Sequence, residues 1–264
     1  MAVSKPAFGA EVLQGSLSVG LVAAYLFNKG SGDVVFDVVS GSTYDVTSIT
    51  PPTLNTWTSG LAAPDITGYD FIGTTGEGLS VAAVPIASSG VGYSVVTKIT
   101  PDFNNGRAAF SIAEGASPGH LDAISLDTVA EAWTRAGGGF VVAKAAGTTT
   151  LVAGTTYTIG ATFASLSARE IFVNGISEGT DGTTQAAVTF DTLCIGQFID
   201  STPSGPYNGD MFFLYIYNRV LSAPEMLAIH NDPYQMMVAS GTTGAGSPSV
   251  GIRRRRRKGM HKAR

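Results

Sequence analysis

Paired carboxylates and histidine-based triads are the two arrangements that would make this chain an enzyme, and its residues are spaced for neither. A glycosidase needs two carboxyl groups roughly 5–9.5 Å apart, and a strand that supplied them would carry acids two residues apart. Candidate acids such as Glu131, Glu170, Glu178 and Glu225 are scattered along the chain instead. The histidines are equally dispersed, at His120, His230 and His261. We therefore expect a protein that is not an enzyme.

Oxygen-bearing side chains come nearest to a metal site at Asp102, Asn104 and Asn105. Such oxygens are ligands that Ca²⁺ prefers, although the spacing does not match an EF-hand. The same string, closed by Gly106, is also typical of a hairpin turn, and we favour that interpretation. The single cysteine, Cys194, lies in an apolar run, where we expect a buried and inert thiol. We thus expect no cofactor, with calcium at this loop as the one candidate.

Exposed aromatic rings are the side chains on which the C–H faces of sugars stack. The candidates are Trp57, Trp133 and Tyr207, of which the first two are the only tryptophans. Rings of these types also commonly pack in a core or at its edge. The sequence alone does not distinguish a sugar site from a core position for any of the three.

A polycationic terminus is the strongest charge feature of the chain. Six consecutive cations stand at Arg253, Arg254, Arg255, Arg256, Arg257 and Lys258. Residues 253–264 hold eight of the sixteen basic residues and no acid, so the rest of the chain has a net charge of −12. Arginine pairs well with carboxylates and phosphates, and contacts to phosphates are strongly salt-dependent. We predict that this tail docks on an acidic protein surface or on nucleic acid.

Short apolar runs separated by turn residues fill the chain from Gly20 onward, with almost no helical periodicity. We expect strands at Leu21–Phe27, Tyr93–Ile99, Ala108–Ile112, Leu121–Leu126, Phe140–Ala143, Tyr157–Phe163, Glu170–Val173, Val188–Phe190 and Met211–Tyr217. In residues 157–163, apolar side chains alternate with Thr and Gly, the period-two pattern of a strand with one buried face. Many short strands without an intervening linker predict a single sandwich or barrel.

Two local signals predict a turn and a helix. Asn174-Gly175 separates two apolar runs and favours a type I′ hairpin turn, because both residues tolerate positive φ. Ser222 and Glu225 have the spacing of a capping box, and Leu221 and Met226 are placed as its hydrophobic staple. A short helix is expected from this cap to about residue 230.

Three segments, in this order, carry a recognisable family pattern. An apolar strand ending at Phe27 leads to a Gly-x-Gly turn and then to Asp37. Residues 170–175 read EIFVNG, and residues 207–225 place YNG before a long run that ends in YNRVLS and Glu225. Together they resemble laminin-G-like, concanavalin A-like jelly-roll domains, of the kind found in tailed-bacteriophage structural proteins. The resemblance covers roughly residues 20–235.

This resemblance implies two antiparallel sheets packed face to face, with the N- and C-terminal strands adjacent. It also implies binding of glycans or proteins, in some members with calcium. The chain departs from the family at Tyr157, where a Trp is common; a Tyr can fill a similar half-buried position.

We therefore predict an all-β jelly-roll sandwich, concanavalin A-like or LamG-like, with a short C-terminal helix and extended termini. Its parts are an N-terminal arm (1–19), the sandwich (20–238), a flexible linker (239–252) and the polycationic tail (253–264). The function expected from the sequence is that of a bacteriophage virion structural or decoration protein, a homo-oligomer docked to other virion proteins through its termini. The alternative is a carbohydrate-binding adhesin or receptor-binding module that recognises host-surface glycans. With no signal peptide and no spanning segment in the sequence, we expect synthesis in the host cytoplasm, location in the virion and no membrane insertion.

Overall fold

The structure is a computed structural model of the chain. It describes residues 5–7, 11–49, 56–59, 65, 67–102, 107–115, 117, 119–137, 142–199 and 202–239. The cations at 253–258 and the calcium candidates Asn104 and Asn105 lie outside these ranges, as does the predicted linker beyond residue 239.

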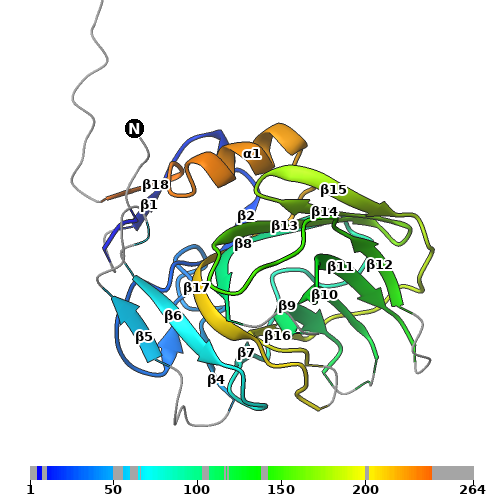
Figure 1. Ribbon diagram of the computed structural model, residues 1–264, viewed down its shortest axis with the longest axis horizontal. Coiled ribbons are helices and arrows are strands. Elements are labelled where there is room, and N and C mark those ends of the chain that lie inside the picture. The colour runs from blue at the N-terminus through cyan, green and yellow to red at the C-terminus, as the bar shows by residue number, and fades with distance from the viewer. Residues whose placement is uncertain are drawn as a thin grey trace, which may run out of the picture.

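Two large antiparallel sheets form the molecule, which confirms the predicted sandwich (Figure 1). One sheet, here called the helix-side sheet, has the strand order β15-β14-β13-β8-β17-β6-β5, with β2 also paired to β17. Its strands are β2 (Leu21–Tyr25), β5 (Thr56–Ser59), β6 (Thr67–Ile72), β8 (Tyr93–Pro101), β13 (Tyr157–Ser165), β14 (Ala168–Val173), β15 (Ile176–Asp181) and β17 (Asn208–Tyr217). The pairing of β2 with β17 confirms that the first and last long strands are neighbours.

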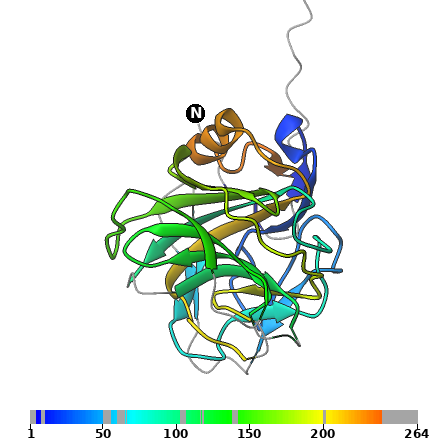
Figure 2. The same cartoon turned by 90° about the vertical axis from the view of Figure 1, so that its right-hand side faces the viewer.

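The second sheet, here called the cavity-side sheet, has the order β12-β11-β10-β9-β16-β7-β4-β3. Its strands are β3 (Val34–Val35), β4 (Val46–Ser48), β7 (Leu79–Val81), β9 (Arg107–Ala113), β10 (Leu121–Leu126), β11 (Ala130–Arg135), β12 (Val142–Ala146) and β16 (Thr192–Ile195). A view turned by 90° shows the two sheets as stacked layers with the helix above them (Figure 2).

The main core lies between the sheets and is built largely from alternate residues of the facing strands. Tyr157, Ile159, Ala161 and Phe163 all point into it, as the period-two pattern predicts. The opposite face of β13 is covered near Gly160, where an added Cβ would lie 2.8 Å from the Met226 sulfur. A helix therefore packs directly on this part of the sheet because one position lacks a side chain.

That helix, α1 (Ala223–Asn231), closes a second apolar cluster on the outer face of the helix-side sheet. The cluster includes Phe213, Tyr215 and Tyr217 of β17 together with Met226 and Ile229 of α1. Beside it, β1 (Glu11–Leu13) pairs with β18 (Met237–Ala239), next to the short 3₁₀ helix η1 (Ser16–Ser18). Part of the predicted N-terminal arm is thus folded onto the sandwich.

Both local sequence signals are confirmed. Asn174 and Gly175 have φ values of 52° and 79° and join β14 to β15. The Ser222–Glu225 capping box forms at the start of α1. Cys194 is fully buried, and burial raises the pKa of its thiol to about 12, in agreement with the expected inert cysteine.

Two expected strands differ from the structure. Val188–Phe190 is extended but forms only an isolated bridge between Ser88 and Thr189, while its apolar side chains fill the core. The strand expected at Phe140–Ala143 is β12, which begins at Val142. Among the described residues, no helix is both long and apolar enough to cross a membrane.

Candidate functional site

A cavity of about 260 Å³ opens on the outer face of the cavity-side sheet, where β10 begins and β11 ends. Its described lining residues are Leu121, Trp133, Arg135, Phe198, Ser204 and Gly205. Its volume lies below the roughly 300–1,000 Å³ that is typical of drug-sized ligands. A single small ring is therefore the scale of ligand that it suits.

Strand alternation explains why these side chains share one face. Trp133 and Arg135 are two residues apart on β11, so both project outward, whereas Thr134 between them is buried. Leu121 of β10 lies opposite Arg135 in the antiparallel register. The pattern Glu-Ala-Trp-Thr-Arg at residues 131–135 thus places a charged, an aromatic and a second charged residue in one line.

The Trp133 indole is held in a fixed orientation. Its Nε1 donates to Oε2 of Glu131 at 2.6 Å, and the other carboxylate oxygen accepts from Lys144 Nζ at 2.7 Å. The Trp133 ring also stacks on Phe198, with centroids 5.3 Å apart and an interplanar angle of 18°. Because Glu131 is 4% exposed, this charge-assisted pair is shielded from solvent and restrains the ring strongly.

The segment that carries Phe198 is itself anchored on the sheet. The backbone groups of Phe198 and Ser204 exchange two hydrogen bonds of 2.9 and 3.1 Å, which close a small loop. The Ala108 N–H of β9 donates to the carbonyl of Gly205 at 2.9 Å. A small apolar cluster containing Phe198 and Leu121 supports the loop from below. The cavity wall is therefore preformed.

Arg135 brings the only charge to the described lining of this cavity. The side chain is half-buried, and burial lowers its pKa from the ordinary value because the cation has lost part of its hydration. The guanidinium remains the charged form at neutral pH, since arginine titrates far above this range.

The other predicted aromatic candidates lie elsewhere. Trp57 is half-buried on β5, the edge strand of the opposite sheet, with its ring edge-on to Tyr69 and Nε1 donating to the Gly32 carbonyl at 2.9 Å. Tyr207 is 1% exposed, and its hydroxyl donates to the Asp210 carbonyl. The prediction of Tyr207 as a stacking residue is therefore wrong, because its ring packs inside the main core.

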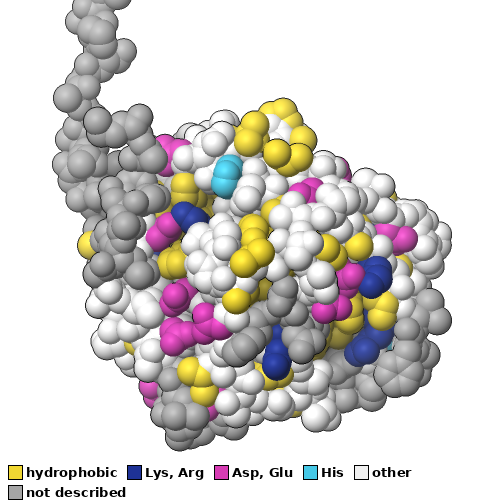
Figure 3. Space-filling model, in the orientation of Figure 1, with side chains coloured by type: hydrophobic (Ala, Val, Ile, Leu, Met, Phe, Trp, Pro, Cys, Tyr) yellow, Lys and Arg dark blue, Asp and Glu magenta, His cyan; other side chains and the backbone are white. Residues whose placement is uncertain are grey.

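Asp102 lies in an acidic group that the sequence did not reveal. Asp70 of β6 stands opposite Asp210 of β17, and Asn208 Nδ2 donates to Asp102. Figure 3 shows acidic side chains gathered over β6 and β17. Burial raises the pKa of both Asp70 and Asp210, and nearby acids add to it: Asp210 and Asp102 act on Asp70, and Asp102 acts on Asp210. Within the described ranges, no group of three or more His, Cys, Asp or Glu has the arrangement of a metal site.

The histidines have partners that sequence spacing did not reveal. His120 Nδ1 lies 2.6 Å from Glu114 Oε2, across the turn between β9 and β10. His230 Nδ1 lies 3.1 Å from the Thr158 hydroxyl. These contacts join loop or helix residues to nearby strands, and neither involves a serine or cysteine nucleophile.

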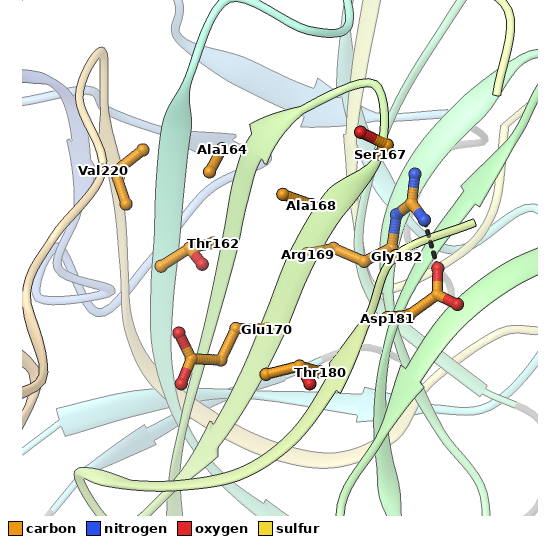
Figure 4. Close-up of a pocket in the computed structure, with 10 residues that line it drawn as sticks. All are labelled: Thr162, Ala164, Ser167, Ala168, Arg169, Glu170, Thr180, Asp181, Gly182 and Val220. Carbon is orange, nitrogen blue, oxygen red and sulfur yellow. Dashed lines mark hydrogen bonds and ion pairs between the residues drawn. The ribbon is translucent and has the colours of Figure 1, made fainter. Parts of the chain in front are cut away.

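A second hollow, of about 320 Å³, lies on the outer face of β13, β14 and β15 (Figure 4). Small and hydroxyl-bearing side chains dominate its lining, with Arg169 pointing away from Glu170 toward Asp181. Arg169 is also bonded to Thr134 of the other sheet and to two carbonyl oxygens. The cation therefore serves to join the sheets, and the described lining offers no aromatic ring for a sugar.

The sequence indicated Trp133 but not the residues around it. Arg135 could have been found from its position two residues after Trp133 on the same strand. Phe198 and Ser204 could not, because about 65 residues of intervening chain separate them from β11 and only the tertiary fold brings them together.

By its fold and cavity, the protein is an antiparallel jelly-roll sandwich with a small hollow, the size of a single sugar ring, on the outer face of one sheet. No family model matches the sequence, and no curated protein matches it. Solved structures do share its fold, at identities too low to show more than the fold.

Three of these similar structures illustrate the range. Domain 4 of AbnA, a GH43 extracellular arabinanase from Geobacillus stearothermophilus solved with arabinotriose, has a TM-score of 0.60 and 16% identity, covering 80% of this chain and 98% of that one. The CBM40 of the Ruminococcus gnavus IT-sialidase, bound to α2,3-sialyllactose, has a TM-score of 0.50 and 15% identity, covering 66% and 97%. The receptor binding domain of botulinum neurotoxin type G has a TM-score of 0.58 and 10% identity, covering 80% and 51%.

Proposed function

We propose that this chain is a non-catalytic carbohydrate-binding module and that the Trp133 cavity is its sugar site. The observation that carries the proposal is a fixed tryptophan at a preformed hollow of sugar size. Sugars bind through stacking of their C–H faces on aromatic rings and through hydrogen bonds to a few polar groups, and Trp133, Arg135 and Ser204 supply both kinds of contact.

Preorganisation supports this site over Trp57. The Trp133 ring is held by Glu131 and Phe198 before any ligand arrives, so little side-chain entropy is lost on binding. The Trp57 ring packs edge-on against Tyr69, and Trp57 lines neither of the two hollows described above. Two of the three similar structures were solved with bound glycans, which supports the proposal of a glycan-binding role here.

A binding role, rather than hydrolysis, is proposed because the described lining of the cavity contains no carboxylate. Glycosidic hydrolysis needs two such groups within about 5–9.5 Å of each other. The nearest acid on β11, Glu131, has both oxygens bonded to Trp133 and Lys144.

A glycan array with the full chain tests the function, and a Trp133→Ala variant tests the site. We expect wild type to bind at least one glycan class and Trp133→Ala to weaken that binding by about tenfold or more, the equivalent of roughly 1.4 kcal/mol. Titration calorimetry with the best array ligand measures the change.

Trp57→Ala is the matched control, because it removes the other indole from the opposite sheet. Binding that survives in Trp57→Ala but not in Trp133→Ala supports the assignment, provided that both variants unfold cooperatively. Binding that Trp133→Ala leaves intact would move the site elsewhere, and a chain that binds no glycan at all would refute the function.

A structural role in a bacteriophage virion is the second candidate, favoured by the polycationic tail and by the sequence resemblance to phage structural proteins. In that case the sandwich is displayed on the particle as a homo-oligomer, and the tail contacts an acidic neighbour or nucleic acid. The two roles are compatible, since a displayed module can bind glycans. Mass spectrometry of purified particles, with stoichiometry, tests the second role, and consistent absence of the chain would exclude it.

A further inference from the structure

A cluster of titratable side chains lies on the outer face of the helix-side sheet, on the opposite sheet from the Trp133 cavity. Its centre is an ion pair between Lys98 Nζ of β8 and Asp65 Oδ2, in which 18% and 11% of the two side chains are exposed. Tyr234, which is fully buried, donates to the other carboxylate oxygen at 2.6 Å. We propose that Lys98 and Asp65 condense to an amide, a covalent cross-link between β8 and the segment before β6.

The reaction needs no reagent from outside the pair. Lys98 Nζ forms a bond to Asp65 Cγ, and the bond from Cγ to one carboxylate oxygen breaks. That oxygen leaves as water with two of the three ammonium protons, and the third proton stays on the amide nitrogen. Nothing is oxidised or reduced, so an ammonium and a carboxylate give one amide and one water.

Proximity and burial favour this condensation, which is slow between separate molecules in water. The fold holds the amine against the carboxyl group, and well-oriented intramolecular reactions reach effective molarities of about 10⁵–10⁸ M. Burial of most of both side chains removes water that stabilises their charged forms. It therefore favours the neutral amine and the neutral carboxylic acid, which are the forms that react.

Tyr234 is placed to assist the attack. As the amine adds to Cγ, negative charge develops on a carboxyl oxygen, and a fixed donor aimed at that oxygen stabilises it. The Tyr234 hydroxyl already donates to Asp65 Oδ1. The Tyr234 ring is held by burial beside Phe213, with centroids 6.0 Å apart. The oxygen that leaves is then Oδ2, which faces Lys98.

Two further groups of the cluster can take up the proton that Lys98 loses before it attacks. Burial lowers the pKa of Lys5 to about 7; the charge of Asp65 opposes this shift, and that of Lys98 adds to it. The Lys5 amine donates to two backbone carbonyls at 2.5 and 2.8 Å. A neutral amine has two N–H donors, so these bonds leave its lone pair for a proton. Burial, with the charge of Lys98, also lowers the pKa of His230, whose ring is therefore neutral at pH 7.

The cross-link would stabilise the sandwich as a disulfide does, which a chain with a single cysteine cannot form internally. It joins residues 33 positions apart, and closing such a loop restricts the unfolded chain. The ion pair of Lys144 with Glu131 offers a comparison, because 49% of the Lys144 side chain is exposed and its ammonium stays hydrated. We expect no amide at that pair.

Peptide mapping tests the inference, because a glutamate-specific protease cuts after Glu77, between the two residues. Wild type is incubated at pH 8, denatured and digested. Residues 12–77 and 78–114 should remain joined, in a species lighter by one water than the two peptides together. Tandem mass spectrometry should place the link at Asp65 and Lys98.

Lys98→Arg is the most informative variant, because arginine keeps an ion pair with Asp65 but offers no amine. It should give two separate peptides and a lower Tm than wild type. Tyr234→Phe should slow linkage by about tenfold or more, measured as the linked fraction against time after cell-free synthesis. Lys144→Arg is the matched control and should leave the link fully formed.

The outcomes decide the inference without any glycan, so they are independent of the proposed function. Separate peptides from wild type after prolonged incubation at pH 8 overturn it, as does a link that persists in Lys98→Arg. A link placed at Lys144 and Glu131 instead also overturns it. Linkage at the wild-type rate in Tyr234→Phe would overturn the role assigned to that hydroxyl.

Discussion

At the scale of single residues, the environment decides which of several similar side chains is available to a ligand. Trp133 and Tyr207 are both aromatic and both lie near loops, yet Trp133 borders a cavity and Tyr207 is 1% exposed. The fold explains the difference: the Tyr207 N–H donates to the Gly196 carbonyl at 2.7 Å, and the Tyr207 ring packs inside the main core with its centroid 5.8 Å from that of Phe71. Neither contact can be predicted from the residues next to Tyr207 in the sequence.

Replacing Asp210 with Asn should stabilise the protein at neutral pH. Asp210 faces Asp70 directly across two strands, and like charges in that position are destabilising. Because burial and neighbouring acids raise the pKa of Asp210, the folded state holds its proton more tightly than the unfolded state does. The free energy of unfolding therefore falls as pH rises through that pKa. We expect the Tm of Asp210→Asn to exceed wild type by about 2 °C at pH 7.

The same variant carries its own check on the cause. At pH 3 the carboxyl is protonated in both states, so the gain in Tm should largely disappear. Asp33→Asn, an exposed site with the same change in charge, should have little effect at either pH. A gain that persists at pH 3, or one matched by Asp33→Asn, would point to something other than repulsion at this cluster.

At the scale of elements, the most accurate predictions were those that depend on a few neighbouring residues. The Asn174-Gly175 turn forms because both residues tolerate a positive φ. The Ser222–Glu225 cap forms because each side chain can accept a hydrogen bond from the backbone N–H of the other residue. The strand predicted at Val188–Phe190 failed because an apolar run indicates burial but does not supply a pairing partner. Burial and strand pairing are separate requirements.

Glu225→Ala should destabilise the protein by about 1 kcal/mol, the usual cost of losing a helix cap. Two bonds from Arg219, at 2.7 and 3.0 Å, and one from the Ser222 N–H lower the pKa of Glu225 to about 2. This contribution is present above the ordinary glutamate pKa and is lost as pH falls from about 4.5 toward 2. Urea unfolding at several pH values should show the difference between wild type and variant shrinking in acid.

Glu225→Gln distinguishes the cap from the ion pair. Glutamine can still complete a capping box but carries no charge for Arg219, so it should retain part of the stability that alanine loses. Equal destabilisation by the two variants would assign the effect to the ion pair alone, and no destabilisation by either would show that packing of α1 suffices.

At the scale of the whole molecule, the sequence indicated the sandwich but not the order of its strands. The central position of β17, between β8 and β6 with β2 alongside, results from pairings across more than 100 residues of chain. The candidate cavity depends on the same long-range order, since β16, which precedes Phe198 in the chain, pairs with β9, and Phe198 stacks on Trp133 of β11 in the same sheet. Local patterning specifies which faces are buried, and register between distant strands specifies what meets on them.

The positive charges of the chain are concentrated in its last twelve residues. Residues 253–264 carry eight positive charges beside a remainder of −12, while the described cores are built from residues 17 to 237. Deleting residues 252–264 should therefore leave the Tm of the sandwich nearly unchanged and abolish attachment to an anionic partner. Differential scanning calorimetry measures the first effect, and incorporation into particles or retention on immobilised nucleic acid measures the second.

The dependence of attachment on salt distinguishes the two kinds of partner. Attachment through phosphates should weaken steeply, by close to one power of the salt concentration for each phosphate neutralised, whereas docking on an acidic protein groove should respond less. Full incorporation of the truncated chain would show that the cations are dispensable and that the sandwich itself makes the contact.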